Sequence, residues 1–95
     1  MSLKEEYQRK LGAKIDEWSA ELEVLKAKAN SAQADARIKY QQELQELNSR
    51  LNELRQKRDR LKTSGEDAWE DIKAGVDKAW DSLSEGLKSA ASRFK

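Results

Sequence analysis

Apolar residues recur along the first two thirds of the chain in steps of four and three. The series is Leu3, Tyr7, Leu11, Ile15, Trp18, Leu22, Leu25, Ala29, Ala32, Ala36, Tyr40, Leu44, Leu47, Leu51, Leu54 and, after Arg58, Leu61. This rhythm is that of the a and d positions of a coiled coil. Charged residues, Gln and Asn flank the series, so it predicts a helix over about residues 3–62 whose narrow apolar seam needs partner helices.

The last third of the chain repeats every eleven residues, since Ala68–Val76 (AWEDIKAGV) aligns with Ala79–Leu87 (AWDSLSEGL). Eleven residues make three helical turns, so the repeat predicts a second helix over about residues 66–94. Its apolar residues then form one straight stripe, made of Trp69, Ile72, Val76, Trp80, Leu83, Leu87 and Phe94. Gly75 and Gly86 mark either tolerated surface positions or a close approach of a neighbouring helix.

The only clear break in the pattern is the turn at residues 63–65, Thr-Ser-Gly. Basic residues precede it and acidic residues follow it, which is the order expected at a helix end and a helix start. Ser64 with Asp67 is a predicted cap for the second helix, and Ser2 with Glu5 for the first.

The two predicted helices differ in length, at about 90 Å and about 43 Å. The second can cover only half of the first, so the seam at residues 3–29 needs another partner. Either the first helix breaks near Asn30-Ser31 and one chain closes as a three-helix bundle, or two chains pair antiparallel and complete each other. The midpoint of residues 3–62 falls in a stretch with five Ala in residues 27–36, which favours a continuous helix. We therefore expect a single-domain, all-α fold in which a long helix and a shorter C-terminal helix form a coiled-coil hairpin. We expect two such chains to form an antiparallel dimer with a three-helix bundle at each end.

A hairpin that turns at residue 64 places Trp80 level with Leu47 of the long helix. A two-fold axis at residues 32–33 places Leu47 level with Trp18 of the other chain. Together, the turn and the axis place Trp69 near Leu61 and near Tyr7 of the other chain. The sequence thus predicts one core layer that contains Trp18, Leu47 and Trp80. The candidate core and self-association residues are Leu11, Ile15, Trp18, Leu22, Leu25, Ala32, Ala36, Leu47, Leu51, Leu54, Trp69, Ile72, Val76, Trp80, Leu83 and Leu87.

Composition narrows the function classes. The 95 residues include 19 Lys and Arg, 18 Asp and Glu, and no His, Cys or Pro, for a formal net charge of +1. Without His or Cys, the commonest general base, metal ligand and thiol nucleophile are missing. Adjacent carboxylates on a helix point apart, so pairs such as Glu70-Asp71 do not predict a shared ligand. We therefore expect no enzyme, no catalytic, cofactor-binding or metal site, and no small-molecule substrate.

The charges are unevenly placed along the chain. Residues 50–62 hold six cations and two acids, whereas residues 66–85 hold seven acids and two Lys. Folding at the turn should bring Glu66, Asp67, Glu70 or Asp71 near Arg55, Arg58 or Lys62. Mutual neutralisation there is favoured over nucleic-acid binding by residues 55–62.

The tail at residues 68–95 resembles that of small bacterial coiled-coil proteins known as stress-response proteins, found in cyanobacteria and proteobacteria. The segments that carry the resemblance are AWEDIKAGVDKAWDSL and KSAASRFK, and the start from Lys4 through Trp18 is similar too. The resemblance implies a cytoplasmic protein linked to stress, without an established molecular activity or a catalytic motif.

The patterns together predict a non-enzymatic coiled-coil protein that self-associates and has a protective or scaffolding role. No run of 18 apolar residues occurs, and the start lacks the apolar core of a secretory signal. The alternative is reversible binding of a lipid surface through the stripe of the second helix. The acidic flanks of that stripe disfavour this alternative, since membrane-surface helices are usually basic.

Overall fold

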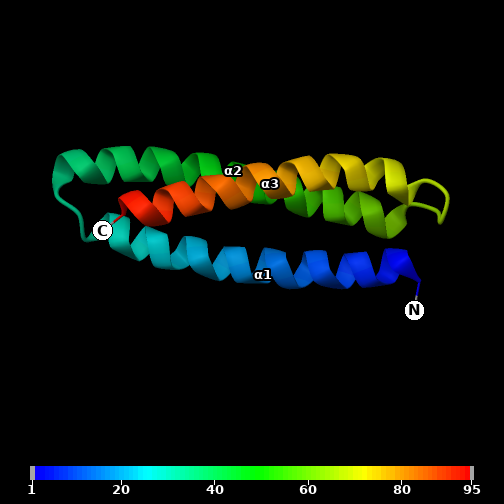
Figure 1. Cartoon of the computed structure of the whole chain (residues 1–95). Helices are drawn as coiled ribbons and strands as arrows, with labels where there is room; N and C mark the ends of the chain where they lie inside the picture. The colour runs from blue at the N-terminus through cyan, green and yellow to red at the C-terminus, as the bar shows by residue number, and fades with distance from the viewer. Residues whose placement is uncertain (1, 95) are drawn as a thin grey trace.

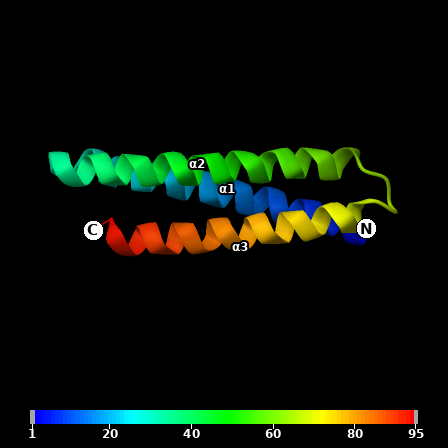
Figure 2. The same ribbon diagram turned by 90° about the horizontal axis from the view of Figure 1, so that it is seen from above.

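Three helices lie side by side and run up, down and up along one axis (Figure 1). The computed structural model describes residues 2–94, which contain α1 (Leu3–Asn30), α2 (Ala34–Thr63) and α3 (Trp69–Arg93). The bundle measures 50 × 19 × 18 Å. In Figure 2, α1 and α3 run in the same direction and α2 runs against both. The predicted all-α class is confirmed, and the described residues contain no strand.

The chain turns between α1 and α2, which corrects the prediction of one helix over residues 3–62. The Ser31 hydroxyl donates a hydrogen bond to the carbonyl oxygen of Ala27 at 3.2 Å, and Gln33 is extended just before α2. A serine side chain that bonds to the preceding turn competes with the backbone ladder there. The turn lets α2 of the same chain bury the seam of α1. The expected antiparallel dimer required an unbroken helix over residues 3–62, and the structure has no such helix. The arrangement present is the alternative, a three-helix bundle within one chain.

The second connection is longer than predicted, because α3 begins at Trp69 rather than near residue 66. The Ser64 hydroxyl donates to the carbonyl oxygen of Leu61 at 2.7 Å, so Ser64 ends α2 and does not cap α3. The cap predicted at the other end is present, since the Ser2 hydroxyl accepts from the backbone N–H of Glu5 at 3.2 Å.

The core is a continuous apolar layer shared by the three helices, and no polar or charged side chain is buried among the described residues. Twelve of the candidate core residues are buried: Leu11, Ile15, Trp18, Leu22, Leu25, Leu47, Leu51, Leu54, Trp69, Val76, Leu83 and Leu87. The other four, Ala32, Ala36, Ile72 and Trp80, are half-buried. Phe94 closes the core at the C-terminal end of α3, where its ring stacks on the ring of Tyr40 with centroids 4.1 Å apart.

The predicted core layer is present in part. Trp18 and Trp80 meet edge to face within one chain, with centroids 5.1 Å apart and planes at 66°. Leu47 lies instead against Gly86, six residues beyond Trp80, because the longer connection shifts α3 along α2. A Cβ built on Gly86 would lie 2.6 Å from Leu47 Cδ2, so the glycine allows a close helix approach. At Gly75 the nearest such atom is 3.6 Å away, which is ordinary contact.

Candidate interaction surface

The contact between α1 and α3 is the least extensive of the three helix pairs. A groove of about 1000 Å³ opens there, beside the first turns of both helices. It is lined by Leu3, Glu6, Tyr7, Arg9, Lys10, Ala13, Trp69, Glu70, Lys73, Ala74 and Asp77. We call this the α1–α3 groove.

Aromatic rings form the floor of the α1–α3 groove. Tyr7 and Trp69 meet with centroids 6.0 Å apart and planes tilted by 43°. Trp69 is only 8% exposed, whereas Leu3 at the mouth of the groove is 72% exposed. Ala13 and Ala74 are exposed, so short side chains border the groove further along. The groove therefore combines an apolar floor with room for another side chain.

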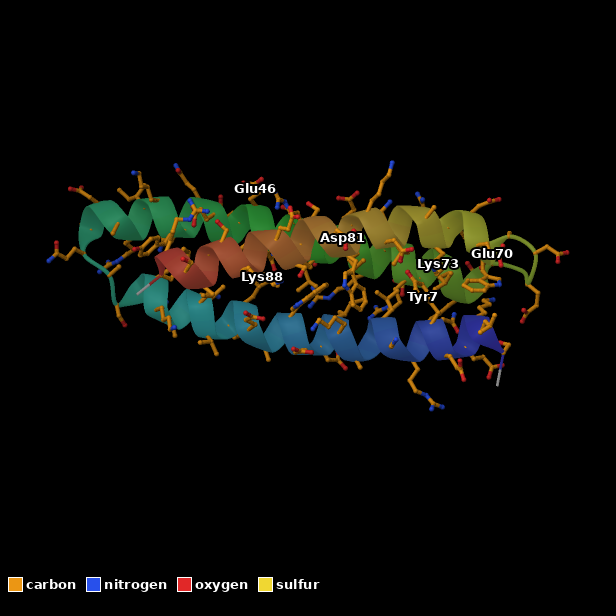
Figure 3. The ribbon with its side chains drawn as sticks, viewed as in Figure 1. Tyr7, Glu46, Glu70, Lys73, Asp81 and Lys88 are labelled. Atoms are coloured by element: carbon orange, nitrogen blue, oxygen red, sulfur yellow. The ribbon has the colours of Figure 1, made fainter. Side chains whose placement is uncertain are left out.

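Polar contacts join the two helices across the groove. Figure 3 labels two of the residues involved, Tyr7 on α1 and Lys73 on α3, which lie beside each other. The Tyr7 hydroxyl donates to Asp77 Oδ1 at 2.7 Å, and Lys73 Nζ lies 3.0 Å from Asp77 Oδ2. Lys73 Nζ also lies 5.2 Å from the centre of the Tyr7 ring, a cation–π distance. We call these three residues the Tyr7–Lys73–Asp77 cluster. It holds the start of α1 against α3.

The environment of the cluster shifts two pKa values. Partial burial alone would raise the pKa of Asp77, but the hydrogen bonds from Tyr7 and Lys73 and the charge of Lys73 outweigh it. The pKa of Asp77 therefore lies below its ordinary value. Burial, and then the hydrogen bond to Asp77 and its negative charge, raise the pKa of Tyr7 far above the usual range. At neutral pH the tyrosine is a hydrogen-bond donor and the carboxylate is ionised.

The rim of the groove carries both signs of charge. On α1, Glu6 comes before Lys10, and on α3, Glu70 comes before Lys73. Glu6, Lys10 and Glu70 are exposed, and Lys73 is half-buried. Charged rims around apolar floors are typical of interfaces between proteins.

The basic and acidic segments expected to neutralise each other are not joined by the predicted ion pairs within the described residues. Within residues 2–94, no ion pair joins Arg55, Arg58 or Lys62 to the acids at 66–71. Arg55 donates to Ser19 of α1 at 3.1 Å, and Arg58 pairs with its neighbour Asp59 at 3.3 Å. The two early acids lie in the connection before α3, and all four are exposed. Instead, α2 and α3 are joined by the ion pair of Glu43 and Arg93.

Sequence reasoning placed Tyr7 and Trp69 on apolar seams but missed Glu6, Lys10 and the Tyr7–Lys73–Asp77 cluster. One signal was available, because a tyrosine on an apolar seam needs a polar partner for its hydroxyl when it is partly buried. Asp77, beside the stripe of α3, could have been that partner.

The fold and the groove define an all-α, three-helix up-down-up bundle with an open, aromatic-floored face. Comparisons with protein-family models, with curated proteins and with solved structures find no match to the chain. Among the described residues, no helix has the length and apolar character needed to cross a membrane.

Proposed function

We propose that this protein is a non-enzymatic helical interaction protein that self-associates and has a protective or scaffolding role in the stress response of the bacterial cytoplasm. The observation that carries the proposal is the α1–α3 groove. Its floor is aromatic, Leu3 is exposed at its mouth, and its rim carries both charges, which is the composition of a docking surface. The link to stress rests on the resemblance of the tail and the start of the chain to bacterial stress-response proteins.

The burial pattern supports an interaction role over an enzymatic one. Every buried side chain among the described residues is apolar, so the interior is devoted to helix packing. The Tyr7–Lys73–Asp77 cluster holds a carboxylate with lowered pKa and a tyrosine with raised pKa. At neutral pH these shifts keep Asp77 ionised and Tyr7 protonated. Neither residue is therefore tuned to exchange a proton with a substrate near neutral pH.

Sedimentation velocity across a dilution series, from about 1 to about 200 μM, tests self-association in the range expected of small interfaces. We expect the weight-average mass to rise with concentration. A mass that stays at one chain throughout would contradict the proposal. The protective role is tested by heating a labile enzyme with and without the protein, and undiminished aggregation would contradict it.

Lipid-surface binding is the second candidate, favoured by the strong segregation of apolar and polar residues on α3. The apolar stripe of α3 is buried at Trp69, Val76, Leu83 and Leu87, so lipid binding requires α3 to leave the bundle. Flotation with anionic vesicles, followed by tryptophan fluorescence, tests this candidate. Lipid binding predicts co-flotation and a blue shift, and the absence of both would remove it.

A further inference from the structure

We propose that the α1–α3 groove docks onto the same groove of a second copy of this chain, with the two copies antiparallel. The inference rests on the proposed self-association and names its surface and register. A two-fold symmetric interface requires a surface that is complementary to itself. Along each of the two helices that border the groove, the residues have this property about a centre on that helix.

The first wall of the groove, on α1, is self-complementary about position 8. An antiparallel copy places residues at equal distances from that centre opposite each other. Exposed Leu3 then lies opposite the small Ala13, and Glu6 lies opposite Lys10. In these two pairs a large residue meets a small one and an acid meets a base, and the third pair places Arg9 opposite Tyr7. By symmetry, every such pair occurs twice in the dimer.

The second wall, on α3, has the same property about a point between residues 71 and 72. Its antiparallel copy places Trp69 opposite Ala74 and Glu70 opposite Lys73. The order of residues is the same as on α1: an acid comes before a base, and a large apolar residue lies opposite an alanine. Asp77 stays on its own chain, bound to Tyr7 and Lys73.

One two-fold axis serves both walls. The ring contacts Tyr7–Trp69 and Trp18–Trp80 both join residues 62 positions apart, which fixes the level of α3 against α1. The centre on α3 is therefore level with positions 9–10 of α1. It lies about one and a half residues, or about 2 Å, from the centre on α1. The two copies would close as a short four-helix bundle around Tyr7 and Trp69.

The size of the groove sets the strength of the association. Eleven residues line it on each chain, whereas a standard stable interface uses about 20–30 residues a side. The dimer should therefore be weak and reversible, with a dissociation constant of micromolar order. It overlaps only at the first turns of α1 and α3, so the dimer is longer than the 50 Å of one bundle.

Charge reversal tests the register directly. Glu6→Lys alone places lysines opposite each other twice in the dimer, and Lys10→Glu alone places glutamates opposite each other twice. We expect each variant to dimerise about tenfold or more weakly than the wild type, since two attractive pairs become repulsive. An equimolar mixture of the two variants restores both pairs, so we expect a heterodimer of about wild-type affinity.

Matched controls change charge elsewhere on the exposed surface. Asp16→Lys and Lys39→Glu lie outside the groove lining and should leave dimerisation unchanged. Circular dichroism verifies that each variant is folded. Should Glu6→Lys disturb the first turn of α1, Glu70→Lys on α3 tests the same interface and should weaken dimerisation equally.

The outcomes separate this inference from the proposed function. A wild type that stays monomeric at every concentration overturns both. A wild type that associates, but whose association neither Glu6→Lys nor Lys10→Glu weakens, overturns the groove interface and leaves self-association standing. Weakening by both variants without recovery in their mixture overturns the antiparallel register. Recovery in the mixture, with both controls unchanged, supports the inference.

Discussion

Two glycines at equivalent positions of the eleven-residue repeat should respond oppositely to alanine. Gly75→Ala and Gly86→Ala make the same chemical change on α3, one before and one after the middle of the helix. In an open helical position, alanine is favoured over glycine by about 0.8–1 kcal/mol. The nearest atom to a new Cβ at Gly75 is Lys57 Nζ at 3.6 Å, the end of a flexible side chain. We therefore expect Gly75→Ala to stabilise the bundle by close to that amount.

Gly86→Ala loses this gain to a steric clash. The new Cβ would lie 2.6 Å from Leu47 Cδ2 and 2.9 Å from Arg50 Nη1. Leu47 is only 4% exposed, so its side chain cannot swing into solvent and must move by about 1 Å against its neighbours. Overpacking of this kind costs about 1–3 kcal/mol. After the helix-propensity gain, we expect a net destabilisation of about 0–2 kcal/mol.

Urea unfolding followed by tryptophan fluorescence measures both variants, and the free energies of unfolding should differ by about 1–3 kcal/mol. Leu47→Val in the Gly86→Ala background supplies the control, because the shorter side chain should relieve the clash and give a favourable coupling energy in a double-mutant cycle. Equal stabilisation by both alanines would refute the close approach of α2 and α3 at Gly86, and with it their register.

Three further predictions concern the contacts between α1 and α3. Trp18→Ala should cost about 3–5 kcal/mol of unfolding free energy, and Trp80→Ala less because Trp80 is half-buried; urea titrations of both check this order. Tyr7→Phe removes one hydrogen bond to a half-exposed carboxylate and should cost about 1 kcal/mol by the same assay; an unchanged midpoint would contradict the contact. The lowered pKa of Asp77 means that its stabilisation is present above its unfolded-state pKa of about 4 and is lost as the pH falls through its lower folded-state pKa. The stability difference between wild type and Asp77→Asn should therefore be constant near neutral pH and shrink below about pH 4, and a pH-independent difference would contradict the shift.

The packing of the core was largely predictable from the sequence. The spacing of Leu11, Ile15 and Trp18 gave the buried face of α1, because a helix buries residues three and four apart on one side. The contact of Trp18 with Trp80 was also predictable, since it follows from the relative levels of two parallel helices.

The connections were less predictable, because turns depend on local competition that apolar periodicity does not record. The alanines around Ser31 favour helix, yet burying the seam of α1 within one chain outweighs their small propensity gain. At the second connection, Gly65 indicated a turn but not its length. Moving the start of α3 to Trp69 leaves Glu66 and Asp67 in the connection, so the predicted ion pairs do not form.

The contact of Tyr7 with Trp69 on the floor of the α1–α3 groove was predictable from the sequence, but the charged rim of the groove was not. Glu6 and Lys10 look like ordinary surface charges of a helix, four residues apart. Only the three-dimensional arrangement shows that they border an aromatic floor on the least closed face of the bundle.

Light scattering combined with small-angle X-ray scattering over a dilution series tests most directly whether one chain closes on itself and associates through its open face. At low concentration we predict the 10.9 kDa mass of one chain and a particle about as long as the 50 Å bundle. At high concentration, mass and length should increase together and reversibly. A doubled mass at every dilution, with a rod of about 90 Å, would contradict the closed bundle and indicate an unbroken helix shared by two chains.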